Sequence, residues 1–161
     1  MAESYARALR IIELRAYAAG ELERRLRQKG DAPDIAAATV ARLRESGLVN
    51  DAQFARQFTR SRLLARGASL RRVEQELARR GVSRAESAAA IAEVAADEQV
   101  DEATLVERAA RKKLRTLASL DPAVRARRIV GFLARRGFQL DTIRTVLRSL
   151  DREAAVQIAG E

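Results

Sequence analysis

The fold is decided by residues 72–82, which read Arg72-Val73-Glu74-Gln75-Glu76-Leu77-Ala78-Arg79-Arg80-Gly81-Val82. Val73 and Leu77 stand eight and four residues before Gly81, a spacing that places both on one face of a helix. Glycine often follows the last turn of a helix, because it adopts the left-handed conformation without strain. The stretch therefore predicts an amphipathic helix that stops at Gly81.

Two further segments have the same register of apolar residues before a glycine: Leu22, Leu26 and Gly30, and Ile129, Leu133 and Gly137. Gly81 follows Gly30 by 51 residues and Gly137 follows Gly81 by 56, so that one unit has about fifty residues. A second apolar helix follows each glycine, with core positions expected at Val40, Leu43, Ile91, Val94, Ile143, Val146 and Leu147. A unit of this size holds three helices, whose small core a neighbouring unit completes.

We therefore expect an all-α fold, an elongated curved array of three tandem three-helix repeats. The expected repeats are residues 1–48, 49–98 and 99–151, and residues 152–161 form a C-terminal tail. Capping residues, prolines and glycines predict helices near 3–18, 20–29, 33–46, 51–66, 69–80, 84–96, 100–119, 122–136 and 140–150. Among the capping signals, Ser83 with Glu86 and Asn50 with Gln53 indicate helix starts.

Composition limits the function. The 161 residues carry 31 Lys and Arg against 22 Asp and Glu, a net charge of +9, which favours a polyanionic partner or an acidic protein surface. A GC-rich genome would also raise the Arg content, without a functional reason. Cys and His are absent, which excludes thiol nucleophiles, imidazole catalysis and the usual zinc sites. We expect neither an enzyme nor a cofactor.

Charged residues are also too frequent for a membrane span. The longest segments without a charge, 35–41 and 154–160, have seven residues each, whereas a spanning helix needs ~20 apolar residues. A cytoplasmic protein with no membrane contact is expected.

A cationic stripe is predicted on the helix over 100–119. Its members recur at i, i+3, i+4 and i+7 and are Arg108, Arg111, Lys112 and Arg115. They lie opposite the apolar positions of that helix, and we expect no carboxylate among them. An ordinary solvated face is the alternative, but such faces usually mix the two signs of charge.

The next helix carries a second group beside Phe132, made of Arg125, Arg128, Arg135 and Arg136. Phe132 is either a core residue or a platform on which a base could stack. Arg56 and Arg60, one turn apart, form a lesser patch. These residues and the stripe are the candidate residues for binding a partner protein or DNA.

Residues 85–107 carry seven carboxylates and no cation. Such a segment is typical of a solvated connection between units. Its pairs Asp97-Glu98 and Asp101-Glu102 could alternatively hold Mg²⁺ weakly.

The middle unit contains an ordered pattern of residues: Asp51, Phe54, Ala55, Arg62, Gly67, Val73, Glu76, Leu77, Arg80 and Gly81. This pattern resembles the central repeat of the RecX family of recombination regulators. The segment from Tyr17 to Gly30 is similar to the family's first repeat, although Gly20 stands where many relatives have a Ser cap, which would weaken one helix start. The resemblance covers most of residues 5–94, and the third unit matches less tightly.

This resemblance implies a non-enzymatic regulator whose partner is the RecA recombinase filament on single-stranded DNA. Members of the family inhibit the ATPase and strand-exchange activities of the recombinase and so modulate recombination and DNA repair, processes linked to the SOS response. We expect the chain to be monomeric. Two other classes stay open: a helix-turn-helix protein that reads duplex DNA, and a helical scaffold without nucleic-acid contact.

Overall fold

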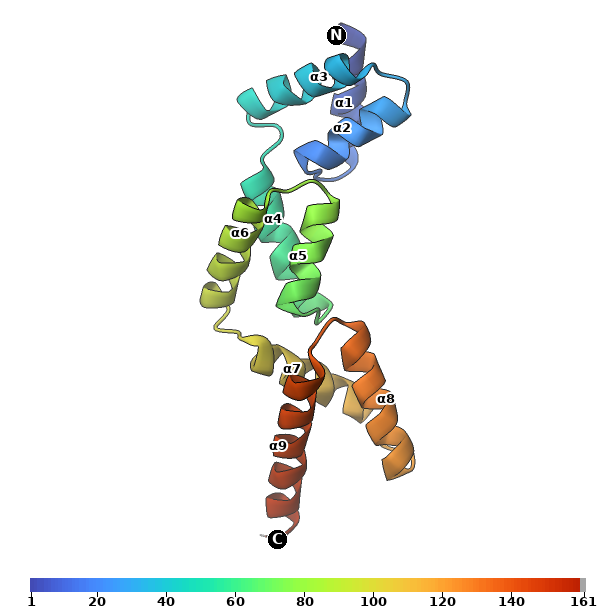
Figure 1. The fold of residues 1–161 in the computed structure, drawn as a ribbon, viewed down its shortest axis with the longest axis vertical. Helices are drawn as coiled ribbons and strands as arrows, with labels where there is room; N and C mark the ends of the chain where they lie inside the picture. The colour runs from blue at the N-terminus through green and yellow to red at the C-terminus, as the bar shows by residue number, and fades with distance from the viewer. Residues whose placement is uncertain (160–161) are drawn as a thin grey trace. The chain divides into compact units, whose positions relative to one another are not determined.

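The computed structural model describes residues 1–159, which are all-helical and contain no strand (Figure 1). The helices of this part of the chain are α1 Ala2–Leu14, α2 Ala19–Gln28, α3 Pro33–Glu45, α4 Asp51–Arg60, α5 Leu70–Arg79, α6 Arg84–Asp97, α7 Glu102–Arg115, α8 Pro122–Arg135 and α9 Leu140–Ala159. A π-helical turn, η1 Ser61–Ala65, continues α4. The all-α prediction is confirmed. None of the described helices is both long and apolar enough to span a membrane.

Three helices end elsewhere than the sequence predicts. α1 ends at Leu14 because the chain is extended at Arg15, and Tyr17 then turns into the core. α7 ends at Arg115 and is followed by turns. α9 continues to Ala159, so that part of the expected tail is helical, since no Gly or Pro interrupts residues 151–159. Residues 160–161 of that tail lie outside the described residues.

The contacts divide the chain into two compact units. The first unit comprises Met1–Thr59 with Glu74–Val94, and the second comprises Arg60–Val73 with the residues from Ala95 onward. The second set of three helices, α4 to α6, thus contributes to both units.

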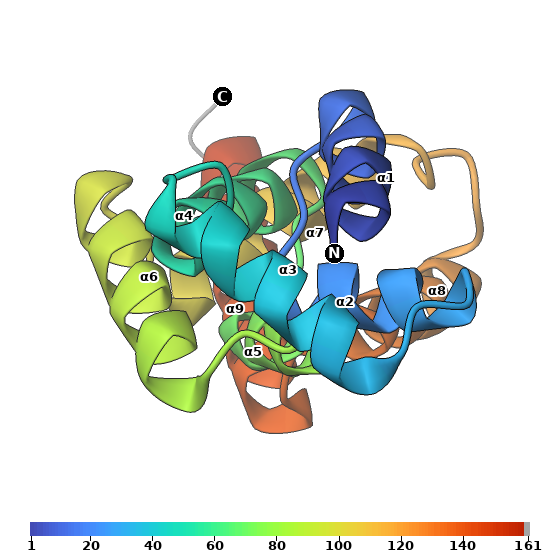
Figure 2. The ribbon, with the colours of Figure 1, turned by 90° about the horizontal axis from the view of Figure 1, so that it is seen from above.

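In the first unit, α1, α2 and α3 pack on one another around a core (Figure 2). The four predicted core residues of this set, Leu22, Leu26, Val40 and Leu43, are all buried in it. Further along the chain, Val73, Leu77, Val94, Ile129, Leu133, Ile143 and Val146 are buried as predicted, whereas Ile91 and Leu147 are half-buried. The register of apolar residues before each glycine therefore marks the core correctly.

A buried carboxylate fixes the start of α2. Asp51 is 5% exposed, and its Oδ1 accepts a hydrogen bond of 2.7 Å from the backbone N–H of Ala19. The guanidinium of Arg44 lies 3.7 Å from the other carboxylate oxygen. Asp51 therefore supplies, from the first turn of α4, the cap that α2 lacks in its own sequence.

The backbones of α2 and of the turn after α5 meet at Gly20 and Gly81. A Cβ built on Gly20 would lie 2.9 Å from the Cα of Gly81, and one built on Gly81 would lie 2.8 Å from the Cα of Gly20. Arg24 donates a 2.6 Å hydrogen bond to the carbonyl of Arg79 beside this contact. The interpretation of Gly20 as a weakened cap is wrong: Gly20 lies within α2 and gives the other backbone room to approach.

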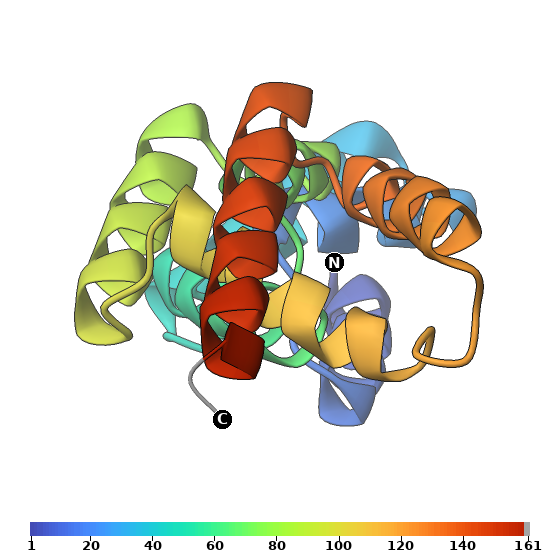
Figure 3. The same ribbon diagram turned by 90° about the horizontal axis from the view of Figure 1, so that it is seen from below.

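The second unit contains α7, α8 and α9, each in contact with the other two, and α9 lies across α7 (Figure 3). Its buried residues include Leu105, Val106, Ile129, Leu133 and Ile143.

In this unit, the turn after α8 packs on the start of α5. A Cβ on Gly137 would lie 2.6 Å from Ser69 Oγ and 2.9 Å from Arg72 Cβ. The N–H of Ser69 donates to the carbonyl of Arg136 at 3.1 Å. Gly137, which follows α8, therefore packs against the start of α5. In the same way Gly81, which follows α5, packs against the start of α2.

We predict that alanine in place of Gly20 or Gly81 lowers the free energy of unfolding because its Cβ meets the other backbone. At Gly81 this loss adds to the strain of the left-handed backbone. Gly30 and Gly81 both have a positive φ, but nothing lies within 4 Å of a Cβ on Gly30. Gly30→Ala should therefore cost about 1–2 kcal/mol from the left-handed backbone, and Gly81→Ala a further ~1–3 kcal/mol from overpacking. Gly20→Ala should also destabilise, although alanine normally favours a helix. Urea unfolding followed by circular dichroism measures the three variants; equal losses for Gly30→Ala and Gly81→Ala would contradict the close contact.

A second prediction concerns the buried cap. Asp51→Ala should lower the free energy of unfolding by about 2 kcal/mol, because it leaves the N–H of Ala19 buried without an acceptor. Asp51→Asn should cost less, since an amide oxygen still accepts that bond. Asn50→Ala, which removes the exposed 2.9 Å cap on Gln53 N–H, is the control for a cap that water can replace. The same urea titration measures the free energy of unfolding of these variants. A decrease in Asp51→Ala no larger than in Asn50→Ala would rule out the proposed role of burial.

Candidate nucleic-acid interface

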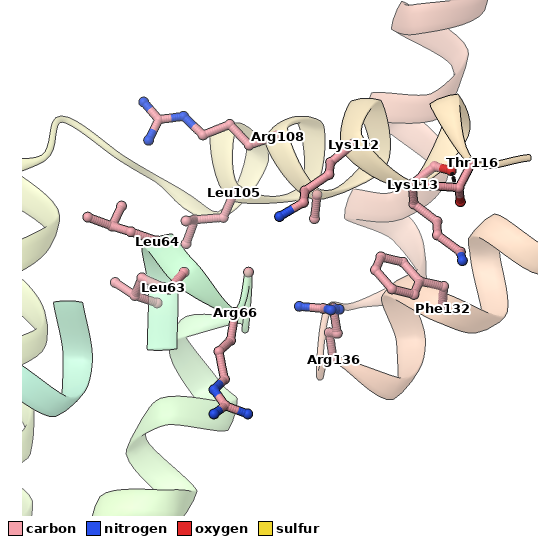
Figure 4. A pocket seen from close by; sticks show the side chains of 13 residues that line it. Leu63, Leu64, Arg66, Leu105, Arg108, Lys112, Lys113, Thr116, Phe132 and Arg136 are labelled. Carbon is pink, nitrogen blue, oxygen red and sulfur yellow. Dashed lines mark hydrogen bonds between the residues drawn. The ribbon is translucent and has the colours of Figure 1, made fainter. Parts of the chain in front are cut away.

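A hollow of about 380 Å³ opens in the second unit (Figure 4). Its walls are the turn over residues 63–67, the outer face of α7 and the last turn of α8. Leu63 and Leu105 are almost fully buried beneath it and Ala109 is 8% exposed, so that the floor is apolar. The hollow therefore combines an apolar floor with an opening to the surface, as small-ligand sites commonly do.

The turn over residues 61–67 shapes one wall. In the π-helical turn η1 a backbone hydrogen bond spans five residues instead of four: Arg66 N–H donates to Ser61 O at 3.3 Å. Gly67 follows with φ +58°, and a Cβ there would lie 3.3 Å from a guanidinium nitrogen of Arg136 and 3.5 Å from Ala109 Cβ. A π-helical turn of this kind is frequent at functional sites, and here it directs residues 63–67 to the hollow.

Five cationic side chains line the hollow: Arg66, Arg108, Lys112, Lys113 and Arg136. Figure 4 shows Lys112 and Lys113 leaving α7 on the side of Phe132 and Arg136. Neither Asp nor Glu is among the lining residues, and within residues 1–159 no carboxylate forms an ion pair with any of the five. Their mutual repulsion is thus left for an outside anion to neutralise.

Phe132 forms part of this cationic wall. The Arg136 guanidinium lies 4.4 Å from the centre of the ring and the Lys113 ammonium 5.5 Å from it. Burial lowers the pKa of Arg136, because the charged guanidinium loses part of its hydration there. Phe132 itself is half-buried and lines the hollow, so the ring is neither a core residue nor a fully exposed one.

Three of the predicted cations meet at this site, namely Arg108, Lys112 and Arg136. Arg66 and Lys113 were not predicted from the sequence. Lys113 is adjacent to Lys112 and lies off the predicted stripe, yet it reaches the hollow from the α8 side. Arg66 is brought there by the π-helical turn, for which the sequence carries no clear signal.

Arg111 lies on the same helix but has carboxylate partners. Its Nε is 2.8 Å from Glu107 and its Nη2 is 2.7 Å from Glu153 on α9. The hydrogen bonds that Arg111 donates to Glu107 and Glu153 raise the pKa of Arg111. The expectation of a stripe without carboxylates is therefore wrong at Arg111.

The lesser patch is neutralised as well. Arg56 lies 3.5 Å from Glu93, and Arg60 lies 3.3 Å from Asp97 and 2.7 Å from Glu98. These carboxylates in and just after α6, expected in a solvated connection, thus pair with the cations of α4. The other predicted residues, Arg115, Arg125, Arg128 and Arg135, are on α7 and α8 outside the lining of the hollow.

Two acidic residues fix the N-terminal end of α7. Asp101 caps α7 by accepting a 2.7 Å bond from the N–H of Thr104, which lowers the pKa of Asp101. Glu102 accepts a 3.4 Å bond from the N–H of Leu70, at the start of α5. Burial raises the pKa of Glu102 despite this bond. Both carboxylates are therefore used structurally, and no group of three or more potential metal ligands occurs among the described residues.

Fold and site together define a class of protein: consecutive three-helix domains with a cationic surface that the carboxylates of residues 1–159 leave unpaired. Three family models match this chain in order, described as the first, second and third three-helix domains of RecX, over residues 5–43, 50–91 and 101–147. The predicted boundaries of the repeats stay a prediction.

Curated relatives agree with these matches. The chain is 40% identical over 142 residues to the regulatory protein RecX of Mycolicibacterium vanbaalenii, covering 84% of this chain and 76% of the relative. It is 34% identical over 161 residues to a regulatory protein RecX of a Mycobacterium species, strain JLS, covering 99% and 84%. The chain belongs to the RecX family. It is a regulatory protein and not an enzyme.

Solved structures show the same fold. The crystal structure of RecX from Lactobacillus salivarius superimposes with a TM-score of 0.71 at 20% identity, covering 93% of this chain and 96% of the other. A second crystal structure, of a regulatory protein RecX, gives a TM-score of 0.74 at 17% identity, covering 91% and 72%. The prediction of three tandem three-helix domains is confirmed.

A pH-dependent prediction follows from Glu102, which joins α7 to the start of α5. Burial raises its folded pKa above the ordinary 4.5, so its ionisation disfavours folding as the pH rises through the folded pKa. Glu102→Gln keeps an acceptor for Leu70 N–H and removes that ionisation. The variant should match the parent in melting temperature below pH 4.5 and exceed it at neutral pH. Glu13→Gln, at an exposed position, controls for the lost charge, and a gap that is constant with pH would refute the prediction.

Proposed function

We propose that this chain binds the RecA recombinase filament on single-stranded DNA and inhibits its ATPase and strand-exchange activities, and so modulates recombination and DNA repair. Membership of the RecX family supports the recombinase as partner. The single observation that carries the DNA contact is the hollow in the second unit, where five cations have no carboxylate partner within the described chain.

The charges of the chain fit a polyanion. The net charge is +9, and the cations nearest the acidic residues of α6 and α9 are already neutralised. The hollow brings together five cations that have no ion-pair partner among the described residues, from α7, the end of α8 and the turn over residues 63–67. Phosphates bound there would release counterions, so binding should weaken steeply with salt.

To inhibit the recombinase, the chain must bind one conformational state of the filament more tightly than another. A ligand changes a conformational equilibrium only if it binds one state more tightly than the other. A chain that bridges neighbouring recombinase subunits would hinder the motions of ATP turnover. If it also occupies the filament groove, it excludes the second duplex, and one binding mode then accounts for both inhibitory effects.

Reading of duplex sequence by a helix-turn-helix is the alternative. The exposed face of α6 carries Ala88, Ala89 and Ala92, which offer no hydrogen bonds to base edges. This composition disfavours α6 as a recognition helix.

The first experiment titrates the chain into recombinase on single-stranded DNA at fixed salt and measures ATP hydrolysis, with binding to the bare DNA recorded in parallel. Inhibition well below the concentration that coats the bare DNA is expected. Inhibition only once the DNA is coated would overturn the filament-specific proposal and leave a general nucleic-acid binder. Absence of inhibition would leave a scaffold.

Alanine variants test whether the cations of the hollow contribute to inhibition. Arg108→Ala with Lys112→Ala should weaken inhibition and reduce the slope of log affinity against log salt by about 0.7 for each phosphate that is no longer bound. Arg84→Ala with Arg127→Ala is the matched control, since it removes two exposed cations that line no part of the hollow. Helicity should be unchanged in both. If the two double variants inhibit equally, the hollow has no part in the mechanism.

A further inference from the structure

We propose that the hollow receives one unstacked base of the single strand, with the base against Phe132 and the adjoining phosphates on Lys112 and Arg136. This inference rests on the proposed function and adds to it the part of the nucleic acid that is bound. It makes the site selective for single strands, because the bases of a duplex are stacked and paired.

The shape and floor of the hollow suit a base. Its volume of about 380 Å³ lies within the range of small-ligand sites, ~300–1,000 Å³. A binding surface for phosphates alone needs no apolar floor, since phosphates are strongly hydrated. Yet Leu63, Leu105 and Ala109 form such a floor here, and a flat, weakly hydrated group gains most from it.

Phe132 provides the aromatic surface. The ring lines the hollow and is only half-buried, so part of it faces the ligand space. Arg136 lies 4.4 Å from the ring centre, and its planar guanidinium can also stack on a base. Aromatic rings beside cations are the usual elements of sites that bind single strands without sequence preference.

The surrounding charge favours a nucleotide over an apolar side chain of a protein partner. All five charged residues of the lining are cations. In a single strand each base carries its own phosphates a short distance away, so one nucleotide satisfies both the apolar floor and the cationic rim. An apolar side chain would occupy the floor and leave the cations unpaired.

The test compares two strands of equal length, oligo-dT and an abasic strand with the same phosphates, by fluorescence anisotropy at fixed salt. The parent chain should bind oligo-dT about tenfold more tightly, the effect of one base stack. Phe132→Leu keeps an apolar side chain without the ring and should bind the two strands alike. Phe58→Leu is the matched control: Phe58 is also half-buried, with a cation, Arg80, 4.9 Å from its ring, but it belongs to the first unit and does not line the hollow.

A second variant reports on the base directly. The chain contains no Trp, so Phe132→Trp introduces a single indole, whose emission should be quenched by oligo-dT and not by the abasic strand. It also guards against a misfolded Phe132→Leu, because the larger ring keeps the stacking surface.

The outcomes separate the two proposals. If the parent and Phe132→Leu favour oligo-dT equally, or the indole emission responds to both strands alike, base insertion is overturned. If the base preference is absent while Arg108→Ala with Lys112→Ala still relieves recombinase inhibition, base insertion fails and the proposed function stands. A base preference that Phe132→Leu abolishes, in a chain that does not inhibit the recombinase, would support the base site and overturn the proposed function.

Discussion

Two backbones meet at Gly20 and Gly81 with no space for a side chain between them, and much of the first unit depends on this contact. It brings the end of α5 against the start of α2, where Arg24 donates to the carbonyl of Arg79 and Arg80 pairs with Glu21 at 2.8 Å. The last carbonyls of a helix lack partners within the helix. At this contact Arg24 of α2 supplies a donor to one of them, the carbonyl of Arg79.

The second unit contains a related contact between Gly137 and Ser69. Again a left-handed glycine after the middle helix of one three-helix set lies against the start of the middle helix of the preceding set, and again a helix-end carbonyl, that of Arg136, accepts a hydrogen bond across it. Gly30, in the first set, has no preceding set and nothing within 4 Å of its added Cβ. The tandem arrangement thus explains why equivalent glycines differ in their surroundings.

The hollow follows from this second contact. Gly137 and Arg136 hold the start of α5, and the turn over residues 61–67 leads directly into it. Gly67 then lies close enough to Arg136 and Ala109 that even a Cβ there would be tight. The residues that fix the two elements together are therefore adjacent in sequence to those that line the hollow.

The sequence predicted the helices and their buried faces well, because both follow from local spacing. Leu22, Leu26 and Gly30 can be recognised without knowledge of any other segment, and the Ser83 and Glu86 capping box forms as expected, with Glu86 N–H donating to Ser83 Oγ at 3.2 Å. The role of Gly20 could not be predicted, since it depends on a residue 61 positions away. Nor could the cap on α2, which comes from Asp51.

The electrostatics of the site were likewise predicted only where they depend on local spacing. Spacing along α7 correctly placed Arg108, Arg111 and Lys112 on the exposed side, but a charge is available to a ligand only if no other element neutralises it. Arg111 meets Glu153 from α9, whereas Lys112 meets no carboxylate in the described chain.

Cations without partners repel one another, and a fold that needed only solubility would gain by placing carboxylates among them. This chain does so at Arg56, Arg60 and Arg111. Around the hollow it does not, although burial already disfavours the charge of Arg136. A bound anion would offset the unfavourable free energy of this charge. It would reduce the repulsion between the cations and also replace the hydration that the guanidinium has lost. The lack of a carboxylate partner, together with the apolar floor, therefore distinguishes the cations of the hollow from Arg56, Arg60 and Arg111.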